Sequence, residues 1–367
     1  MSKATEIETP QIPALVAGTG HGLRVLVPAL NASGFRVVGL VGADPERTQK
    51  RADDNAIPHA FTDLDKAIAA TGARAVAIAT PPHTHGALVH AAVARGCHVL
   101  CEKPFARDAA EARGMLAAAE RAGVVHLVGN QFRMMPERVT VARAIADGLI
   151  GEPRLLTITQ YVGLVAAPEA KRPAWWFDDA AGGGWLGASG SHMIDMVRSW
   201  LGEFAALSAA LTIVSDRRGV AEDTYLLRFT MANGAEGVLM QTGGAWGEAA
   251  AMNRVAGTHG TLAMDRGKVW LSDRKGTREL HTPPELALPE IAPSDDPAQP
   301  YLHIELPPAL RLCQAWRSAI AGGGFGPVPV ATFADGVACM EVIDVIRASA
   351  AAGGSLVSVS KGQGATI

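Results

Sequence analysis

A glycine-rich turn near the start of the chain is the first segment whose residue types suggest chemistry. It joins an apolar run, residues 13–17, to a stretch of helical character, residues 23–32. Bare glycine backbone lets a pyrophosphate approach closely, and the start of a helix offers free N–H groups and a positive dipole end. We therefore expect a dinucleotide to contact the residues of this turn, which are Gly18, Thr19, Gly20, His21, Gly22 and Leu23. The pattern G-x-G-x-x-G is incomplete because Leu23 stands at its third glycine, so an ordinary glycine turn is the alternative.

The end of the second apolar run, residues 35–41, bears on which dinucleotide binds. In sites of this type an acidic residue roughly 20 residues past the glycines contacts the adenosine ribose. Asp44 either has that role or caps the helix that Pro45 begins. Gly42 leaves room for a 2′-phosphate that Arg47 could reach. We therefore favour NADP over NAD, with Asp44 and Arg47 as cofactor-binding candidates.

Two further groups of residues follow apolar runs. The third run, residues 75–79, ends in a loop that contains Ala79, Thr80, Pro81, Pro82 and His85, and the fourth, residues 97–100, is followed by Glu102 and Lys103. Ligands of an open parallel sheet bind beyond the carboxyl ends of its strands, where both loops would lie. A lysine there can donate to a substrate hydroxyl or, once desolvated, accept its proton. The alternative is a surface lysine in a turn, and the Lys103–Pro104 bond is a candidate for the cis form.

Strand-like and helix-like segments alternate through the first third of the chain, which predicts βαβ units and a parallel sheet. We assign residues 1–130 to a Rossmann domain that binds NAD or NADP. After residue 130 the runs have period-two or β-branched character, which predicts a mostly antiparallel open sheet. Residues 131–367 would form this second α/β domain, for substrate binding and oligomer contacts. Helices expected near residues 191–201, 308–321 and 333–350 would cover one face of its sheet.

The chain resembles the glucose–fructose oxidoreductase/inositol dehydrogenase (Gfo/Idh/MocA) family in a series of motifs. Gly-x-Gly, Thr-Pro-Pro-x-x-His and Glu-Lys-Pro come first, followed by Gly-Asn-Gln-Phe-Arg at 129–133, Gly-Leu-Ile-Gly-Glu-Pro at 148–153, three glycines at 182–184 and Gly-Ser-His-Met-Ile-Asp at 190–195. The motifs cover about the first 205 residues, and the remainder is similar only in its strand pattern. The combination is specific for the family and much less so for a substrate.

The resemblance implies roles for particular residues. Lys103 would contact the substrate hydroxyl near the nicotinamide, and His192 would be the general acid/base. Glu102 and the Thr-Pro-Pro loop would line the cofactor. Without the resemblance, a histidine at a helix start is more often a capping or core residue. Arg133, which ends its motif, is a candidate substrate-binding residue.

The sequence departs from the family at one position. Many relatives have an aspartate four residues before the histidine, where this chain has Ala188. Either the substrate differs from the polyols of those relatives, or another carboxylate takes the place of the missing one. Asp195, three residues after His192, is the candidate we assign to the substrate site.

An aromatic segment precedes the second set of glycines. Trp175 and Trp176 could form a pocket wall or lid, because aromatic rings supply much contact surface at little entropy cost. A hydrophobic anchor that packs the loop onto the domain, or onto a second subunit, is an equal alternative. Arg172 is a candidate contact for an acidic substrate.

Composition limits the class of protein. The 33 basic and 36 acidic residues give a net charge of −3, which indicates neither nucleic acid nor an anionic membrane as partner. Four cysteines without regular spacing, a polar start and no long apolar run favour a cytoplasmic protein. No His/Cys/carboxylate spacing suggests a metal.

We therefore expect an NAD(P)-dependent oxidoreductase that transfers a hydride between nicotinamide and a carbinol or carbonyl carbon. By resemblance the substrate is a sugar, a cyclitol or a related small hydroxy compound, and the protein is a homodimer or homotetramer. Two alternatives stay open: a binding protein that senses dinucleotide without turnover, and a family member that uses NAD for redox-assisted lyase or hydrolase chemistry.

Overall fold

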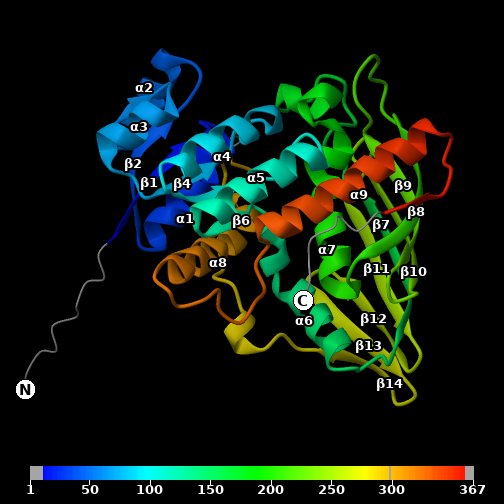
Figure 1. Cartoon of the computed structure of the whole chain (residues 1–367). Helices are drawn as coiled ribbons and strands as arrows, with labels where there is room; N and C mark the ends of the chain where they lie inside the picture. Colours follow the sequence, from blue (N-terminus) through cyan, green and yellow to red (C-terminus); the bar gives the residue numbers. More distant parts are fainter. Residues whose placement is uncertain (1–10, 297–298, 360–367) are drawn as a thin grey trace, which may run out of the picture.

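A computed structural model describes residues 11–296 and 299–359. Its first part is a six-stranded parallel sheet with the order β3-β2-β1-β4-β5-β6, as the alternating pattern predicts. The strands are β1 (Ile12–Ala17), β2 (Phe35–Val41), β3 (Ala60–Phe61), β4 (Ala75–Ile78), β5 (His98–Cys101) and β6 (His126–Val128). The helices after them are α1 (Val27–Ala32), α2 (Pro45–Asp54), α3 (Leu64–Thr71), α4 (His85–Ala94) and α5 (Ala109–Ala122). This is the Rossmann arrangement (Figure 1).

Local sequence signals explain where these helices begin and end. Asp44, Asp63 and Asp108 each cap a helix by accepting a hydrogen bond from the backbone N–H three residues on. The helix expected over residues 23–32 is divided into a π-helical turn, η1 (Gly22–Leu26), and α1. Pro28 has no N–H to donate to the carbonyl of Arg24, which is consistent with a change of hydrogen-bond pattern at this point.

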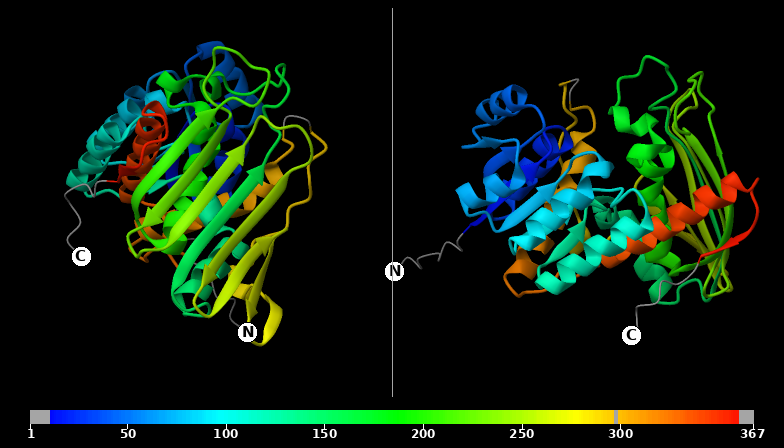
Figure 2. Two further views of the ribbon diagram at one scale, coloured as in Figure 1. Left: turned by 90° about the vertical axis from the view of Figure 1, so that its right-hand side faces the viewer. Right: turned by 45° about the horizontal axis from the view of Figure 1, so that its top comes forward.

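The second part is a nine-stranded sheet with the order β14-β13-β12-β11-β7-β10-β9-β8-β15. Its neighbours are antiparallel except β7 and β10, which run parallel, so the prediction of a mostly antiparallel sheet is confirmed. The strands are β7 (Pro153–Tyr161), β8 (Phe204–Thr212), β9 (Thr224–Met231), β10 (Glu236–Thr242), β11 (Ala250–Gly257), β12 (Gly260–Asp265), β13 (Lys268–Asp273), β14 (Gly276–Leu280) and β15 (Val357–Ser358). Figure 2 shows its outer face uncovered by helices.

Within the described residues, four α-helices follow β6: α6 (Pro136–Ala146), α7 (Ser191–Leu201), α8 (Leu302–Ile320) and α9 (Phe333–Ala351). A capping box between Thr332 and Asp335 begins α9, which packs between α5 and β8. None of the helices in the two described stretches is long and apolar enough to cross a membrane.

The expectation that the helix near 308–321 covers the second sheet is wrong. Helix α8 returns to the first sheet, where Trp316 stacks on Phe35 with ring centroids 5.0 Å apart. The backbone N–H of Val128 in β6 donates to the carbonyl of Ala331 at 2.8 Å, so the chain after α8 also pairs with the first sheet. An apolar helix face fits either sheet, and the sequence pattern does not choose between them.

Candidate active site

The glycine turn lies against the loop that follows β4. Gly18 has φ +116°, and a Cβ there would lie 2.3 Å from the carbonyl oxygen of Ala79. Only glycine tolerates both the backbone angle and this close approach. A Cβ at Gly22 would lie 2.9 Å from Val16 Cγ1. The turn therefore keeps bare backbone at the carboxyl end of β1, as a dinucleotide site requires.

At the end of β2, Asp44 has one of its two predicted roles, whereas Gly42 differs from its expectation. Asp44 accepts a hydrogen bond from the backbone N–H of Arg47 at 2.8 Å, so it caps α2. A Cβ at Gly42 would lie 2.3 Å from Thr48 Oγ1 and 2.8 Å from Thr19 Cγ2. The space that we expected Gly42 to leave for a 2′-phosphate is thus filled by two threonines.

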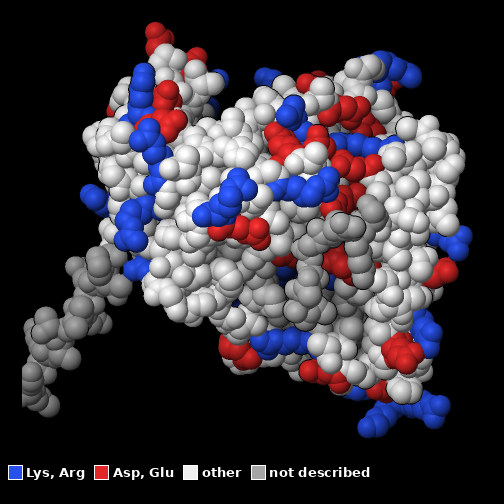
Figure 3. Space-filling view, in the orientation of Figure 1, with Lys and Arg blue, Asp and Glu red and all other residues white. Residues whose placement is uncertain are grey.

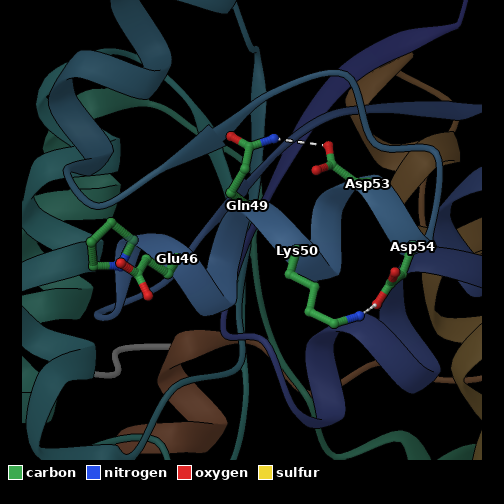
Figure 4. Close-up of a pocket in the computed structure, with 6 residues that line it drawn as sticks. Glu46, Gln49, Lys50, Asp53 and Asp54 are labelled. Atoms are coloured by element: carbon green, nitrogen blue, oxygen red, sulfur yellow. Dashed lines mark hydrogen bonds and ion pairs between the residues drawn. The ribbon is translucent and has the colours of Figure 1, made fainter.

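A shallow hollow lies over helix α2. It is lined by Pro45, Glu46, Gln49, Lys50, Asp53 and Asp54 (Figure 4). Gln49 donates to Asp53 at 2.8 Å and Lys50 to Asp54 at 2.7 Å along the helix. Four of its polar side chains thus pair with one another, and no predicted site residue lines it.

Lys103 follows β5 and reaches the second half of the chain. Its Nζ donates to the carbonyl oxygen of Ala188 at 2.7 Å, and the Lys103–Pro104 bond is cis. Ala188 belongs to a π-helical turn, η6 (Leu186–Gly190), that leads into α7. Burial lowers the pKa of Lys103, while Glu102 and Glu305 oppose that shift. Ala188 stands where many relatives have an aspartate, and it thus contributes its backbone carbonyl oxygen to Lys103.

Glu102 lies beneath the glycine turn. Its Oε1 is 3.4 Å from His21 Nε2, and its Oε2 accepts from the backbone N–H of Lys103 at 3.2 Å. Burial raises the pKa of Glu102, but His21 and Lys103 outweigh it, so the net pKa is lowered and the carboxylate is charged. A Cβ at Gly129 would lie 2.6 Å from Glu102 Oε1, so the residue after β6 also packs against this side chain.

His192 lies in the first turn of α7, buried, with its ring centroid 4.7 Å from that of Phe132. Burial lowers its pKa well below the usual value, and Lys103, Arg138 and His21 lower it further. The imidazole is therefore neutral at neutral pH. The structure brings together His21, Glu102, Lys103 and His192 at the carboxyl ends of β1 and β5.

Two family models match the chain. One describes an oxidoreductase family with an NAD-binding Rossmann fold and covers residues 12–130; the other, the GFO/IDH/MocA C-terminal domain, covers residues 139–263. This chain belongs to the Gfo/Idh/MocA family. The resemblance seen in its motifs is confirmed.

Relatives and solved structures agree with the assignment to this family. Levoglucosan dehydrogenase of Pseudarthrobacter phenanthrenivorans is 27% identical over 354 residues, which cover 84% of this chain and 86% of the relative. D-apiose dehydrogenase of Paraburkholderia graminis is 32% identical over 214 residues, 56% of this chain and 53% of the relative. A solved levoglucosan dehydrogenase in complex with NADH and levoglucosan has a TM-score of 0.82 at 26% identity, covering 96% of this chain and all of that one (100%).

In this Gfo/Idh/MocA protein two predicted substrate residues pair with each other. Arg133 binds both carboxylate oxygens of Asp195, donates to Asp335 at 3.1 Å and donates to the carbonyl of Val330 at 3.0 Å. Both members of the pair are nearly inaccessible to solvent. Asp195 is therefore directed to Arg133, which leaves its suggested role as replacement carboxylate without a supporting contact.

His85 also differs from its predicted role. Its Nε2 lies 2.9 Å from the carbonyl oxygen of Thr80 and its Nδ1 3.2 Å from that of Phe105, and the residue is fully buried. The ring thus links the loop after β4, through Thr80, to the loop after β5, through Phe105. It thus has no exposed face for the predicted contact with the cofactor.

The aromatic segment of this family member packs onto the hydrophobic core. Trp176 meets Trp185 edge-on at 5.7 Å, and a Cβ at Gly182, just after the segment, would lie 3.1 Å from Pro82 Cβ in the first domain. Trp175 packs partly buried against the same core, and Arg172 donates to the carbonyl of Leu164 at 3.0 Å. Arg172 therefore stabilises its own loop.

Sequence reasoning missed three residues around the site. Arg51 of α2 donates to Thr19 Oγ1 at 2.9 Å, and Glu222 accepts from the backbone N–H of Leu186 at 3.0 Å at the start of η6. Burial raises the pKa of Glu222 to about 7. Glu305 of α8 binds Arg24 of η1. None of the three lies in a recognisable motif. Among the described residues, no group of His, Cys, Asp or Glu side chains could hold a metal ion.

Proposed function

We propose that the protein is an NAD-dependent dehydrogenase or reductase that acts on a secondary hydroxyl of a sugar or a closely related polyol. The observation that supports this most is the placement of Lys103 at the segment that carries His192: its Nζ donates to the carbonyl oxygen of Ala188, four residues before His192, at 2.7 Å. The relatives named above support the substrate class, because two of them are sugar dehydrogenases. The earlier preference for NADP is withdrawn, since the space at Gly42 is filled and the similar solved structure contains NADH.

The residues present fit a dinucleotide. The bare turn at Gly18 and Gly20 would take the pyrophosphate, with Arg51 holding the turn from α2. Bound NAD supplies the hydride acceptor or donor. During oxidation of the alcohol, Lys103 in its neutral form takes the hydroxyl proton as the hydride leaves the carbon; during reduction its ammonium group returns the proton. His192, neutral and buried, is the second group able to exchange that proton.

The expected result is substrate-dependent interconversion of NAD⁺ and NADH by the purified protein. A panel of levoglucosan, L-sorbose, D-apiose, other aldoses and ketoses, and inositols tests it, with NADP(H) compared in parallel. Tight NADH binding with no turnover on any compound would favour the dinucleotide-sensing alternative. Lyase or hydrolase products without net NADH formation would favour redox-assisted chemistry.

We also propose that the protein is a homo-oligomer through the outer face of the nine-stranded sheet. Apolar side chains lie exposed there on four adjacent strands: Leu155, Leu226, Val238 and Met252. On another face, seen in Figure 3, basic and acidic side chains are interspersed. An exposed apolar stripe is typical of a contact between subunits. Sedimentation velocity is expected to give a dimer or tetramer; a monomer at micromolar concentration would refute this proposal.

A further inference from the structure

Helix α8 begins beside the segment that follows the glycine turn. Glu305 Oε2 in its first turn lies 3.2 Å from Arg24 Nη2, although the two residues are 281 positions apart in sequence. Both side chains are partly buried, with exposed fractions of 20% for Glu305 and 34% for Arg24. Helix α8 also packs against η1 and against the turn after β6, η3 (Gln131–Met134). The start of α8 is therefore a wall of the same site.

Arg24 directly follows the glycine turn, in η1. Its backbone N–H donates to the carbonyl of Gly20 at 3.1 Å, inside the glycine segment. On the opposite side Arg51 holds the same turn through Thr19. Of these two arginines, Arg24 is the one that brings a carboxylate from α8 to the turn.

The titratable and charged groups near Lys103 come from distant parts of the chain. Glu102 and Glu305 favour the charged form, and Glu305 does so from α8. Lys103 and His21 in turn lower the pKa of His192. The groups to be considered together are Glu102, Glu305, His21, Arg24 and His192.

We propose that Glu305 is a positioning residue of the active site, which holds Arg24 at the glycine turn and adds a second carboxylate charge to the surroundings of Lys103. The proposal deepens the proposed function, since it concerns the group that exchanges the substrate proton. A nearby carboxylate favours the ammonium form of a lysine, whereas burial favours the amine. Glu305 thus helps to set the balance between the two forms that oxidation and reduction require.

The alternative is that the ion pair between Glu305 and Arg24 only stabilises the packing of α8 on η1. Two variants separate the possibilities, because each removes one charge of the same ion pair and the charges that remain are opposite. Glu305→Gln removes the negative charge and leaves Arg24, so the pKa of Lys103 should fall by on the order of half a unit. Arg24→Met removes the positive charge and leaves Glu305 unneutralised, so the pKa of Lys103 should rise. A structural role would make the two variants alike.

The measurement is an NMR titration of protein labelled at the lysine ε-carbons, with the Lys103 signal assigned by its loss in Lys103→Met. Glu285→Gln is the matched control, because it breaks another ion pair of an arginine, Arg143 at 3.3 Å, that does not act on Lys103. Opposite shifts in Glu305→Gln and Arg24→Met, with none in the control, support the proposal. Shifts in the same direction, or no shift, overturn it.

Kinetics give a second readout. If the protein oxidises a sugar, the rising limb of kcat/KM against pH should move to lower pH in Glu305→Gln and to higher pH in Arg24→Met. The NMR titration needs no turnover, so it judges this inference even where the proposed function fails. Active enzyme with an unmoved Lys103 titration refutes the role of Glu305 alone.

Discussion

Replacing Lys103 with methionine is expected to lower kcat by about two to four orders of magnitude, the usual contribution of a positioned proton donor or acceptor. Methionine has nearly the same length but no proton to exchange, and it leaves the carbonyl of Ala188 without its 2.7 Å donor. Affinity for NADH should change little, because the glycine turn does not depend on this side chain. Stopped-flow hydride transfer and NADH fluorescence titration measure the two quantities separately.

A surface variant, Lys50→Met, controls for the loss of a lysine, because its partner Asp54 lies on the same exposed helix. It should retain wild-type kcat. If Lys103→Met retained full turnover, or lost NADH affinity in proportion to kcat, Lys103 would have to be removed from the proton path.

Replacing Arg133 with methionine is expected to reduce the free energy of unfolding by about 3–5 kcal/mol, the cost of leaving buried charge without a partner. Arg133 lies between Asp195 and Asp335 and is 9% exposed. Chemical denaturation at neutral pH measures the loss. Arg143→Met is the control, since its exposed pair with Glu285 should contribute less than about 1 kcal/mol.

The deficit of Arg133→Met should depend on pH. Burial raises the pKa of Asp335, but Arg133 and Arg198 outweigh it and the net pKa is lowered. In the wild type this contributes stability above the unfolded-state pKa of the carboxyl, and that stability is lost as pH falls. Arg133→Met has less of this stability to lose, so the free energies of unfolding of the variant and the wild type should converge toward acid pH. A difference that stays constant from neutral to acid pH would contradict this account.

The sequence predicted the parts of the site that depend on local pattern. The glycine turn, Glu102 and Lys103 each follow a recognisable strand, and the carboxyl ends of parallel strands share one edge. It did not predict contacts made by packing. Arg24 and Glu305 are separated by most of the chain, and nothing local to either indicates the other. The sequence suggested open space beside Gly42, because Thr48 and Thr19 come into contact with this glycine only in the folded chain.

His85 and Asp195 show the same limit of sequence patterns. Each lies in a motif, but motifs give residue type and spacing and do not give side-chain direction. His85 turns inward to two carbonyls and Asp195 turns to an arginine 62 positions earlier. Helix α8 was assigned to the wrong sheet because its apolar face suits either one.

The return of α8 to the first sheet has a consequence for biosynthesis. Trp316 covers Phe35, and Ala331 pairs with Val128, so the N-terminal core lacks its cover until more than 330 residues have been synthesised. On the ribosome, the nascent β1–β2 region would display apolar surface for most of translation, a period in which chaperones and proteases compete for it. Premature termination anywhere before α8 should therefore yield an aggregation-prone fragment rather than a stable N-terminal domain.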